Sequence, residues 1–256
     1  MNLINAFDAP IYEFETIDST NKYAKNLCNT NPKTGTIIIS NEQTNGRGRF
    51  GNSWESSKNN GLYYSIIFKK EFENLKYETL TLFLCLGITK LLEDYSISSN
   101  IKWPNDILIN HRNVCGILCE SISNTYGEFI IAGIGINLYH NENDFPNELR
   151  KKATSLKLNT PKIIIKNYFI NSLTNYLFKY YNYFLSNNFE NFLHEYTDKS
   201  YLLNKKIYIK LNENEINGTV YGFNNFGHLL LKTDNEIISI NSGEISLKNV
   251  YKNSGH

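Results

Sequence analysis

The sequence lacks most of the features that mark membrane and secreted proteins. Its 256 residues contain no apolar run that approaches the ~20 residues of a membrane span. The N-terminal stretch MNLINAFDAPIYEF has neither a basic start nor a long apolar segment, so it does not resemble a secretory signal. Four cysteines without such a signal indicate free thiols in a reducing compartment, and we expect a cytoplasmic protein.

Two further deficits concern ligands. The five histidines are scattered without metal-ligand spacing, so we expect no structural metal site. The net charge of only +1 argues against broad binding to nucleic-acid phosphates. Cys115 and Cys119 are four residues apart, which places them on one expected strand and outside a CxxC pair. What remains is an ordinary globular composition, long enough for one large domain and a small one.

Helical and strand periodicities alternate over the first 200 residues, which predicts an α+β fold with a mixed or antiparallel sheet. A helix capped by Ser19 or Thr20 follows the first strand, and the clearest amphipathic helix covers residues 77–95. Residues 139–160 look irregular, and two helices are expected within 162–198. The expected strands cover residues 11–16, 35–40, 61–68 and 128–138, with a further strand, turn and hairpin in 99–123.

The pattern changes after residue 203. Short apolar strands such as KKIYIKL, HLLLKT and GEISLK are joined by Asn/Gly turns, which is typical of a small β-barrel. We therefore expect one domain over residues 1–203 and a second over 204–256.

The most unusual stretch is NEQTNGRGRFGNSW, residues 41–54, here called the Gly/Arg loop. Its glycines let backbone N–H groups approach a ligand, while Arg47 and Arg49 offer bidentate donors for a carboxylate or phosphate. It lacks the spacing of a P-loop. A solvated surface loop is the alternative interpretation, because arginine–glycine pairs also occur in RNA-binding tails.

Three more stretches could line a site. IKWPNDILI places Lys102, Asn105 and Asp106 at a strand edge, although an ordinary hairpin would look the same. In IAGIGIN, two glycines leave one face of a strand bare, for a flat ligand or for close packing. In DSTN, exposed N–H groups and hydroxyls at a helix start could hold a polar group or serve only as a cap.

Taken in order, these stretches are similar to the biotin protein ligases. DSTN, EQTNGRGRFGNSW, GLYYSIIF, KWPNDI, VCGILCE, GIGINL and GEISL resemble that family in sequence and spacing from about residue 11 to 250. The resemblance implies a class II synthetase-like catalytic domain followed by an SH3-like barrel. It also implies a two-step reaction: ATP and biotin give biotinyl-5′-AMP, and a lysine of a biotin carboxyl carrier domain then takes the biotin.

The resemblance also implies residue roles. Arg49 would retain the adenylate and act in catalysis together with Asn113, Lys102 and Asp106, the last orienting or deprotonating the incoming lysine. Biotin would contact Ser19, Thr20, Asn21, Gln43, Gly46, Arg47, Gly48, Gly116, Gly133 and Gly135. The nucleotide would contact Arg49, Trp54, Asn137 and Lys248. Mg²⁺ would arrive with ATP, and no metal site built from protein residues is expected.

Two positions depart from the family pattern. Asn113 stands where the family usually has a lysine, and losing such a donor could cost roughly 10²–10³ in rate. Arg112 is adjacent, but neighbouring strand residues point to opposite faces, so the hairpin geometry decides whether it compensates. Asn52 stands where the family often has arginine, which affects how firmly the loop closes.

The resemblance leaves alternatives open. An inactive homologue that binds biotin or its adenylate would fit Asn113, a lipoate or octanoate ligase would share the fold, and a nucleic-acid-binding protein would fit the Gly/Arg loop. The catalytic pattern begins by about residue 11, so we expect no DNA-binding module and no binding to DNA or membranes. A homodimer is plausible because side-by-side dimers occur in the family.

Overall fold

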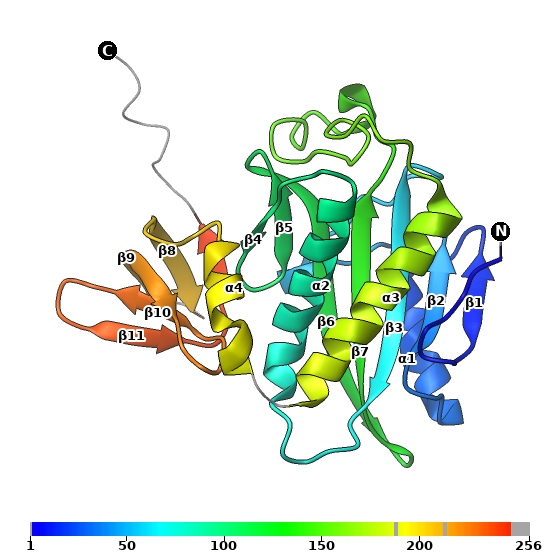
Figure 1. The fold of residues 1–256 in the computed structure, drawn as a ribbon, viewed down its shortest axis with the longest axis horizontal. Helices are drawn as coiled ribbons and strands as arrows, with labels where there is room; N and C mark the ends of the chain where they lie inside the picture. Colours follow the sequence, from blue (N-terminus) through cyan, green and yellow to red (C-terminus); the bar gives the residue numbers. More distant parts are fainter. Residues whose placement is uncertain (1, 187–188, 212–213, 247–256) are drawn as a thin grey trace.

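The computed structural model describes residues 2–186, 189–211 and 214–246. They form a seven-stranded sheet with helices on both faces and, beside it, a smaller five-stranded sheet (Figure 1). This arrangement is the α+β fold that the alternating periodicities predicted.

The large sheet has the strand order β1-β2-β3-β7-β6-β5-β4. Only the β1–β2 pair is parallel, and the other neighbours are antiparallel. The strands are β1 (Ile11–Phe14), β2 (Thr36–Ser40), β3 (Gly61–Lys69), β4 (Asn100–Lys102), β5 (Asp106–Ile109), β6 (Arg112–Asn124) and β7 (Gly127–Asn137). The predicted strands are all present, and Cys115 and Cys119 share β6 as expected.

The helices divide between the two faces of this sheet. Helices α2 (Leu80–Asp94) and α3 (Lys166–Leu185) cross one face side by side, and α1 (Thr20–Leu27) packs behind β2, β3 and β7 (Figure 1). Ser19 caps α1 by accepting a hydrogen bond from the Lys22 N–H. The expected helix over 77–95 begins with a 3₁₀ turn, Tyr77–Thr79, and becomes α-helical at Leu80.

Alternate residues of each strand enter two separate cores, because successive side chains point to opposite faces. On β2, Ile37 and Ile39 join the large core under α2 and α3, whereas Ile38 joins the small core under α1. The small core covers only one end of the α1 face. The rest of that face is not filled by this core and can line a binding site.

The smaller sheet has the order β11-β10-β9-β8-β12, all antiparallel. Its strands are β8 (Lys206–Leu211), β9 (Asn214–Phe223), β10 (Leu229–Lys232), β11 (Ile237–Ile240) and β12 (Glu244–Ser246). It continues the large core through Ile207, Val220 and Leu231, among others. The buried Trp103 indole N–H also donates to the Gly227 carbonyl at 2.9 Å, so the β4–β5 turn is fixed to the small sheet.

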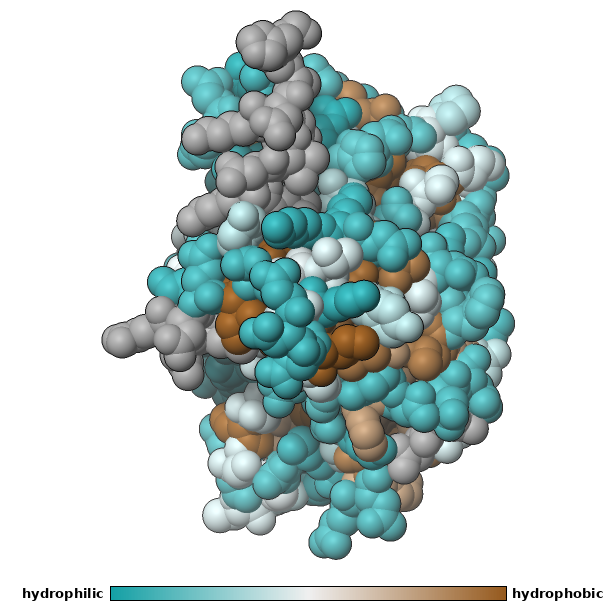
Figure 2. All heavy atoms as spheres, turned by 90° about the vertical axis from the view of Figure 1, so that its left-hand side faces the viewer, coloured by the Kyte–Doolittle hydropathy of each residue, from teal (hydrophilic) through white to brown (hydrophobic). Residues whose placement is uncertain are grey.

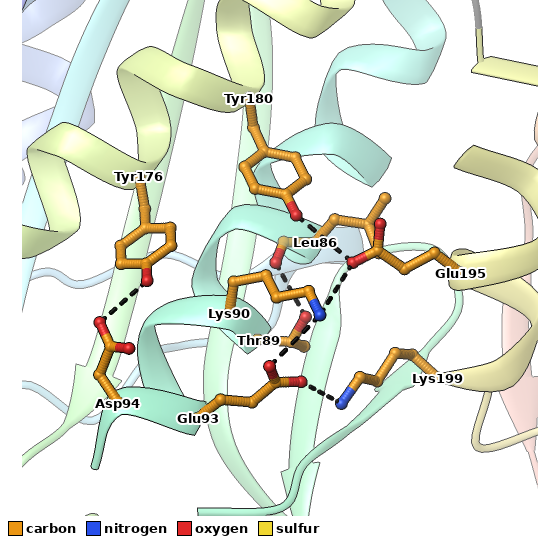
Figure 3. A network of polar contacts seen from close by, with 9 residues as sticks. All are labelled: Leu86, Thr89, Lys90, Glu93, Asp94, Tyr176, Tyr180, Glu195 and Lys199. Atoms are coloured by element: carbon orange, nitrogen blue, oxygen red, sulfur yellow. Dashed lines mark hydrogen bonds and ion pairs between the residues drawn. The ribbon is translucent and has the colours of Figure 1, made fainter. Parts of the chain in front are cut away.

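A polar network on the outside of α2 holds helix α4 (Leu193–Asp198), which leads into the small sheet (Figure 3). Lys90 lies 3.3 Å from both Glu93 and Glu195, and Glu93 pairs with Lys199 at 2.7 Å. Tyr180 of α3 donates to Glu195 at 3.4 Å. These contacts join α2, α3 and α4, and they help to fix the small sheet relative to the large one.

The face that the small sheet presents is mainly hydrophilic, with hydrophobic side chains in small separate groups (Figure 2). Exposed apolar side chains of this sheet include Tyr221 and Ile237. Among the described helices, none is both long and apolar enough to cross a membrane.

Candidate active site

A cavity of about 300 Å³ lies on the α1 face of the large sheet, under the Gly/Arg loop. Sixteen of the residues singled out in the sequence line it: Ser19, Thr20, Asn21, Gln43, Arg47, Gly48, Arg49, Asn52, Trp54, Lys102, Asn105, Asp106, Asn113, Gly116, Gly133 and Gly135. Segments that are far apart in the chain therefore meet in one place. The Gly/Arg loop and strand β7, which carries Gly133 and Gly135, are parts of the same site, although neither stretch alone indicated a ligand site.

The floor of the cavity consists of two rows of residues that run across neighbouring strands. One row pairs Tyr63 with Gly135, Gly135 with Gly116 and Gly116 with Asp106. The next row pairs the buried Ser65 with Gly133 and Gly133 with Leu118, and of these three residues Gly133 and Leu118 line the cavity. Directly paired residues on one face lie close together, so a ligand on this floor meets four strands at once.

Gly133 provides room for the Asn21 amide. A Cβ atom at position 133 would lie 2.2 Å from the Asn21 side-chain oxygen, closer than atoms can approach. Asn21 is buried, and its Nδ2 donates to Glu120 at 2.9 Å, while the Ser65 hydroxyl lies 2.7 Å from its Oδ1. The sequence left open whether this glycine serves close packing or a ligand, and close packing of a polar side chain is what the structure shows.

A hydrogen-bond chain continues from Asn21 towards the loop. Gln43 accepts from both the backbone N–H and the hydroxyl of Thr20, at 2.9 and 3.1 Å. The Gln43 Nε2 donates to Ser56 at 3.0 Å, and Ser56 in turn donates to the Trp54 carbonyl at 3.0 Å. This chain fixes the orientation of the Gln43 amide, and it connects the start of α1 to the end of the loop.

Trp54 lies across the bare backbone of the other two glycines. A Cβ at Gly135 would lie 2.4 Å from the indole, and one at Gly116 would lie 2.8 Å from it. The indole Nε1 is buried and has no hydrogen-bond partner in the structure. An unsatisfied buried donor is costly, so this atom is suited to meet an acceptor on a ligand.

Both arginines of the loop contact the sheet. The Arg47 Nη1 lies 3.2 Å from Glu120 of β6, and the Arg49 Nη1 donates to the Asn105 side-chain oxygen at 2.9 Å. Phe50 follows with φ 55° and an exposed ring, over which the Arg49 guanidinium lies at 4.7 Å. The loop thus bridges the cavity between β6 and the β4–β5 turn.

Lys102 and Asp106 face each other across the β4–β5 turn, with Lys102 Nζ 3.8 Å from Asp106 Oδ2. Burial raises the pKa of the Asp106 carboxyl above its ordinary value, although Lys102 and Arg49 act in the opposite direction. A carboxylate of this kind is suited to accept a proton.

Asn113 reaches the cavity because of a β-bulge. The pairing of β5 with β6 shifts register between Ile107 and Leu108, so that Leu108 pairs with Asn113. Without the extra residue, positions 113 and 116 would point to opposite faces. The Asn113 Oδ1 is buried and has no hydrogen-bond partner among the described residues. Arg112 lies 3.3 Å from Glu142 and does not line the cavity.

Two of the residues given a site role from the sequence do not line the cavity, and the place of a third is not described. Gly46 faces another part of the same loop, where a Cβ would meet the Trp54 carbonyl at 2.4 Å. Asn137 is buried and donates to the Thr154 carbonyl at 3.0 Å. Lys248 is outside the described residues.

Several lining residues were missed in the sequence. Tyr63 lies on the site face of a strand that looked uniformly apolar, and no local pattern marks it. Gly243 and Ile245 bring the small sheet to the cavity, and the closing GEISL stretch was their only indication. Within the part of the chain that the structure describes, no three His, Cys, Asp or Glu residues gather to hold a metal ion.

Two profiles of known protein families match this chain. Residues 13–137 match the profile of the Biotin/lipoate A/B protein ligase family, and residues 202–248 match the Biotin protein ligase C terminal domain. The first match contains nearly all of the cavity residues.

Individual relatives extend over most of the chain. The Bifunctional ligase/repressor BirA of Bacillus subtilis is 34% identical over 239 residues, which cover 91% of this chain and 72% of that protein. Its Escherichia coli namesake is 28% identical and covers 92% and 73%. The structure of the biotin protein ligase from Aquifex aeolicus in complex with biotin and ATP has a TM-score of 0.80, 31% identity and coverage of 93% and 97%. This chain belongs to the biotin protein ligase family.

Proposed function

We propose that this protein is an ATP-dependent biotin ligase. It forms biotinyl-5′-AMP from biotin and ATP, and it transfers the biotin to a lysine of a carrier domain. The observation that carries the proposal is the single cavity that combines both loop arginines, Lys102 and Asp106 over a glycine floor. The chain also shares its fold and 31% sequence identity with a biotin protein ligase whose structure was solved with biotin and ATP, and this similarity supports the proposal.

The biotin ring occupies the end of the cavity near the start of α1. Ser19, Thr20, Asn21 and Gln43 supply polar atoms there, and their hydrogen-bond chain is already formed. Gly133 lets the Asn21 amide pack close to the sheet, Gly135 lets the Trp54 indole lie flat against it, and Leu118 adds a further apolar contact. A pocket that combines fixed polar groups with an aromatic surface is suited to a bicyclic ring that carries a polar ureido group.

The positive groups of the cavity address the main electrostatic difficulty of adenylation. A carboxylate must attack a phosphate, and both are anions, so fixed cations have to offset their repulsion. Arg47, Arg49 and Lys102 all line the cavity, Arg47 towards β6 and the other two beside the β4–β5 turn. Arg47 meets the biotin carboxylate, and Arg49 retains the adenylate under the loop.

Asn113 supplies a neutral amide rather than a charge. Arg112 pairs with Glu142 and does not compensate. Lys102 lies in the same cavity and is the cation that we assign to the reacting phosphate in place of a lysine at 113.

Asp106 is the group that we assign to the transfer step. It lies at the cavity wall, and burial raises its pKa, so it can take a proton from the incoming lysine ammonium. The amine then attacks the mixed anhydride and AMP leaves.

The residues of the cavity fit a magnesium ion that arrives on the phosphates of ATP. The Asp106 carboxylate and the unpaired Asn113 Oδ1 are oxygen donors of the type that Mg²⁺ accepts, and Mg²⁺ usually takes few protein ligands. The ion would neutralise phosphate charge during adenylation.

The remaining assignments concern the nucleotide and the acceptor. We assign the nucleotide to the side of the cavity where the small sheet contributes Gly243 and Ile245. Lys248, which lies outside the described residues, is a further proposed contact. Residues 1–203 form the catalytic domain and 204–256 the smaller one. The acceptor is the biotin carboxyl carrier domain of a carboxylase such as acetyl-CoA carboxylase.

Exchange of labelled pyrophosphate into ATP tests the first step. We expect exchange that depends on biotin and Mg²⁺, and no exchange when lipoate or octanoate replaces biotin. Exchange with lipoate in place of biotin would contradict the proposal. Titration calorimetry with biotin then separates an inactive binding protein, which would bind without exchange, from a protein that does not recognise biotin at all.

A further inference from the structure

Glu120 occupies a central position beside the cavity that the proposed reaction leaves unused. It lies on β6, on the same face as Leu118 and Gly116, and it pairs across the sheet with Ile131 of the small core. Only 15% of its side chain is exposed. A carboxylate this far from water requires partners, and the structure provides three of them.

Two partners come from α1 and fix the carboxylate. Lys25 donates to its Oε1 at 2.6 Å, and the Asn21 amide donates to its Oε2 at 2.9 Å. Burial raises the pKa of the Glu120 carboxyl, but the bonds from Lys25 and Asn21 outweigh this and leave it below its ordinary value. The group is therefore ionised at neutral pH and held from both oxygens.

The third partner is Arg47 of the Gly/Arg loop, whose Nη1 lies 3.2 Å from Oε1. The Arg47 side chain is 47% exposed, so water competes for it and Glu120 is its fixed anchor. Two cations and one carboxylate leave the cluster of Lys25, Arg47 and Glu120 with a net charge of +1 (+1 + 1 − 1). The cluster therefore still attracts an anion.

We propose that Glu120 is a positioning residue: anchored by α1, it holds Arg47 at the cavity wall before biotin arrives. The inference rests on the proposed function, because it takes the biotin carboxylate as the ligand of Arg47. Holding the guanidinium in advance removes part of the ordering that binding would otherwise require. Glu120 itself does not touch the substrate.

Steady-state pyrophosphate-exchange kinetics of Glu120→Gln test this role. The substitution keeps the shape of the side chain and removes its charge. Loss of a charge-assisted contact that orders Arg47 should raise KM for biotin about tenfold, while KM for ATP and kcat stay within about twofold. Glu128→Gln is the matched control, because Glu128 lies on β7 in an exposed ion pair with Lys70 at 2.8 Å. It should leave all three parameters within about twofold of the native chain.

A double variant shows whether Glu120 acts through Arg47. If it does, Arg47→Met combined with Glu120→Gln should be no worse for biotin than Arg47→Met alone, within about twofold. A purely structural role would make the two losses multiply, and it would lower kcat and the unfolding temperature together. If Glu120→Gln does not fold, Glu120→Asp keeps the charge with a shorter reach, and a KM increase of about threefold is then expected.

The outcomes separate the two proposals. If the native chain is active and Glu120→Gln leaves the KM for biotin unchanged, the role of Glu120 alone is overturned. The same holds for an unchanged KM in Glu120→Asp if only that variant folds. Multiplicative losses in the double variant overturn it too. A native chain that neither binds biotin nor supports exchange overturns the proposed function and this inference together.

Discussion

The two faces of the central sheet use the same strands for opposite purposes. Under α2 and α3, β3 and β7 contribute Tyr64, Ile66 and Ile134 to a closed apolar core. One residue along each strand, on the other face, Tyr63, Gly133 and Gly135 line the cavity, and Ser65 holds the Asn21 amide beside it. Stability and ligand recognition are therefore separated by a single step in sequence.

The difference also concerns polarity. The core face is filled by aliphatic and aromatic side chains, whereas the site face has glycines, hydroxyls, amides and the half-buried carboxylates of Asp106 and Glu120. The core face stabilises the fold through buried apolar area, whereas the hydrogen-bond chain of the site face holds polar groups in place for a ligand. Substitutions on the core face should therefore lower stability, and substitutions on the site face should weaken binding and lower the rate.

The largest effect is expected on the core face. Phe68 is fully buried and stacks on Tyr181 with ring centroids 4.6 Å apart. Phe68→Ala should lower the free energy of unfolding by about 3–5 kcal/mol, because it leaves a cavity in the core. Urea unfolding measures the loss. Biotin KM of the protein that remains folded should be unchanged, and a large rise in KM would show that the two faces are not independent.

The second effect is expected on the site face. Gly135→Ala places a methyl group where the Trp54 indole lies, at 2.4 Å, so the indole must leave the floor. Biotin-dependent exchange should fall about 100-fold, because a displaced wall disturbs the ligand position. The unfolding free energy should change by less than about 1 kcal/mol, since an added methyl group near a cavity has space to relax. A loss of stability equal to that of Phe68→Ala would contradict the separation of the faces.

A smaller effect is expected at the mouth of the cavity. Arg49→Gly removes the contact with Asn105 and the cation that retains the adenylate. Adenylate synthesis should remain measurable, while release of biotinyl-5′-AMP into solution should rise about tenfold, the loss expected for one charge-assisted bond. Chromatography of the filtered reaction mixture measures the free adenylate. Unchanged release would show that Arg49 does not retain it.

The smallest effect concerns pH. His140 is fully buried, with its Nε2 3.2 Å from the Ser57 hydroxyl and its ring stacked on Phe145. Burial lowers its pKa below 6.5, and Asp144 opposes this only partly. The folded state therefore binds fewer protons than the unfolded state below about pH 6.5. The contribution of neutral His140 to the free energy of unfolding is complete above pH 6.5, and it decreases as the pH falls towards the folded-state pKa.

Urea unfolding at pH values between 7.5 and about 5 measures this dependence. The free energy of unfolding should fall by about 1 kcal/mol or less over the part of this range in which the carboxylates stay ionised. His140→Gln keeps a polar side chain and should flatten the slope in that range. An equal slope in both proteins would assign the pH dependence to other groups.

Much of the fold could be predicted from the sequence, because its determinants are local. Alternation marked the strands, the apolar period marked α2, and Ser19 marked the start of α1. The exact start of α2 could not be predicted. Residues Tyr77–Thr79 fit the same pattern of apolar and polar positions as the helix, yet they form a 3₁₀ turn.

The site was predictable where residues carry unusual chemistry and not where geometry decides. The loop arginines and the glycine pair were visible as motifs, but the bulge that turns Asn113 into the cavity has no local sequence mark. The roles of Glu120 and Ser65 also depend on contacts with residues that are more than 40 positions away. Asn137 looked like a ligand residue but bonds to the Thr154 carbonyl, since a buried amide is satisfied by backbone as readily as by a ligand.

The most direct test of the central claim is transfer of biotin to a carrier domain, followed by the mass of the carrier. The native chain, ATP, Mg²⁺ and biotin are compared with the Asn113→Lys variant. With the native chain we expect the carrier mass to increase by one biotin, because Lys102 and Arg49 supply the charge that Asn113 lacks. No increase with the native chain and a full increase with Asn113→Lys would contradict it, and would show a biotin-binding protein on a ligase fold.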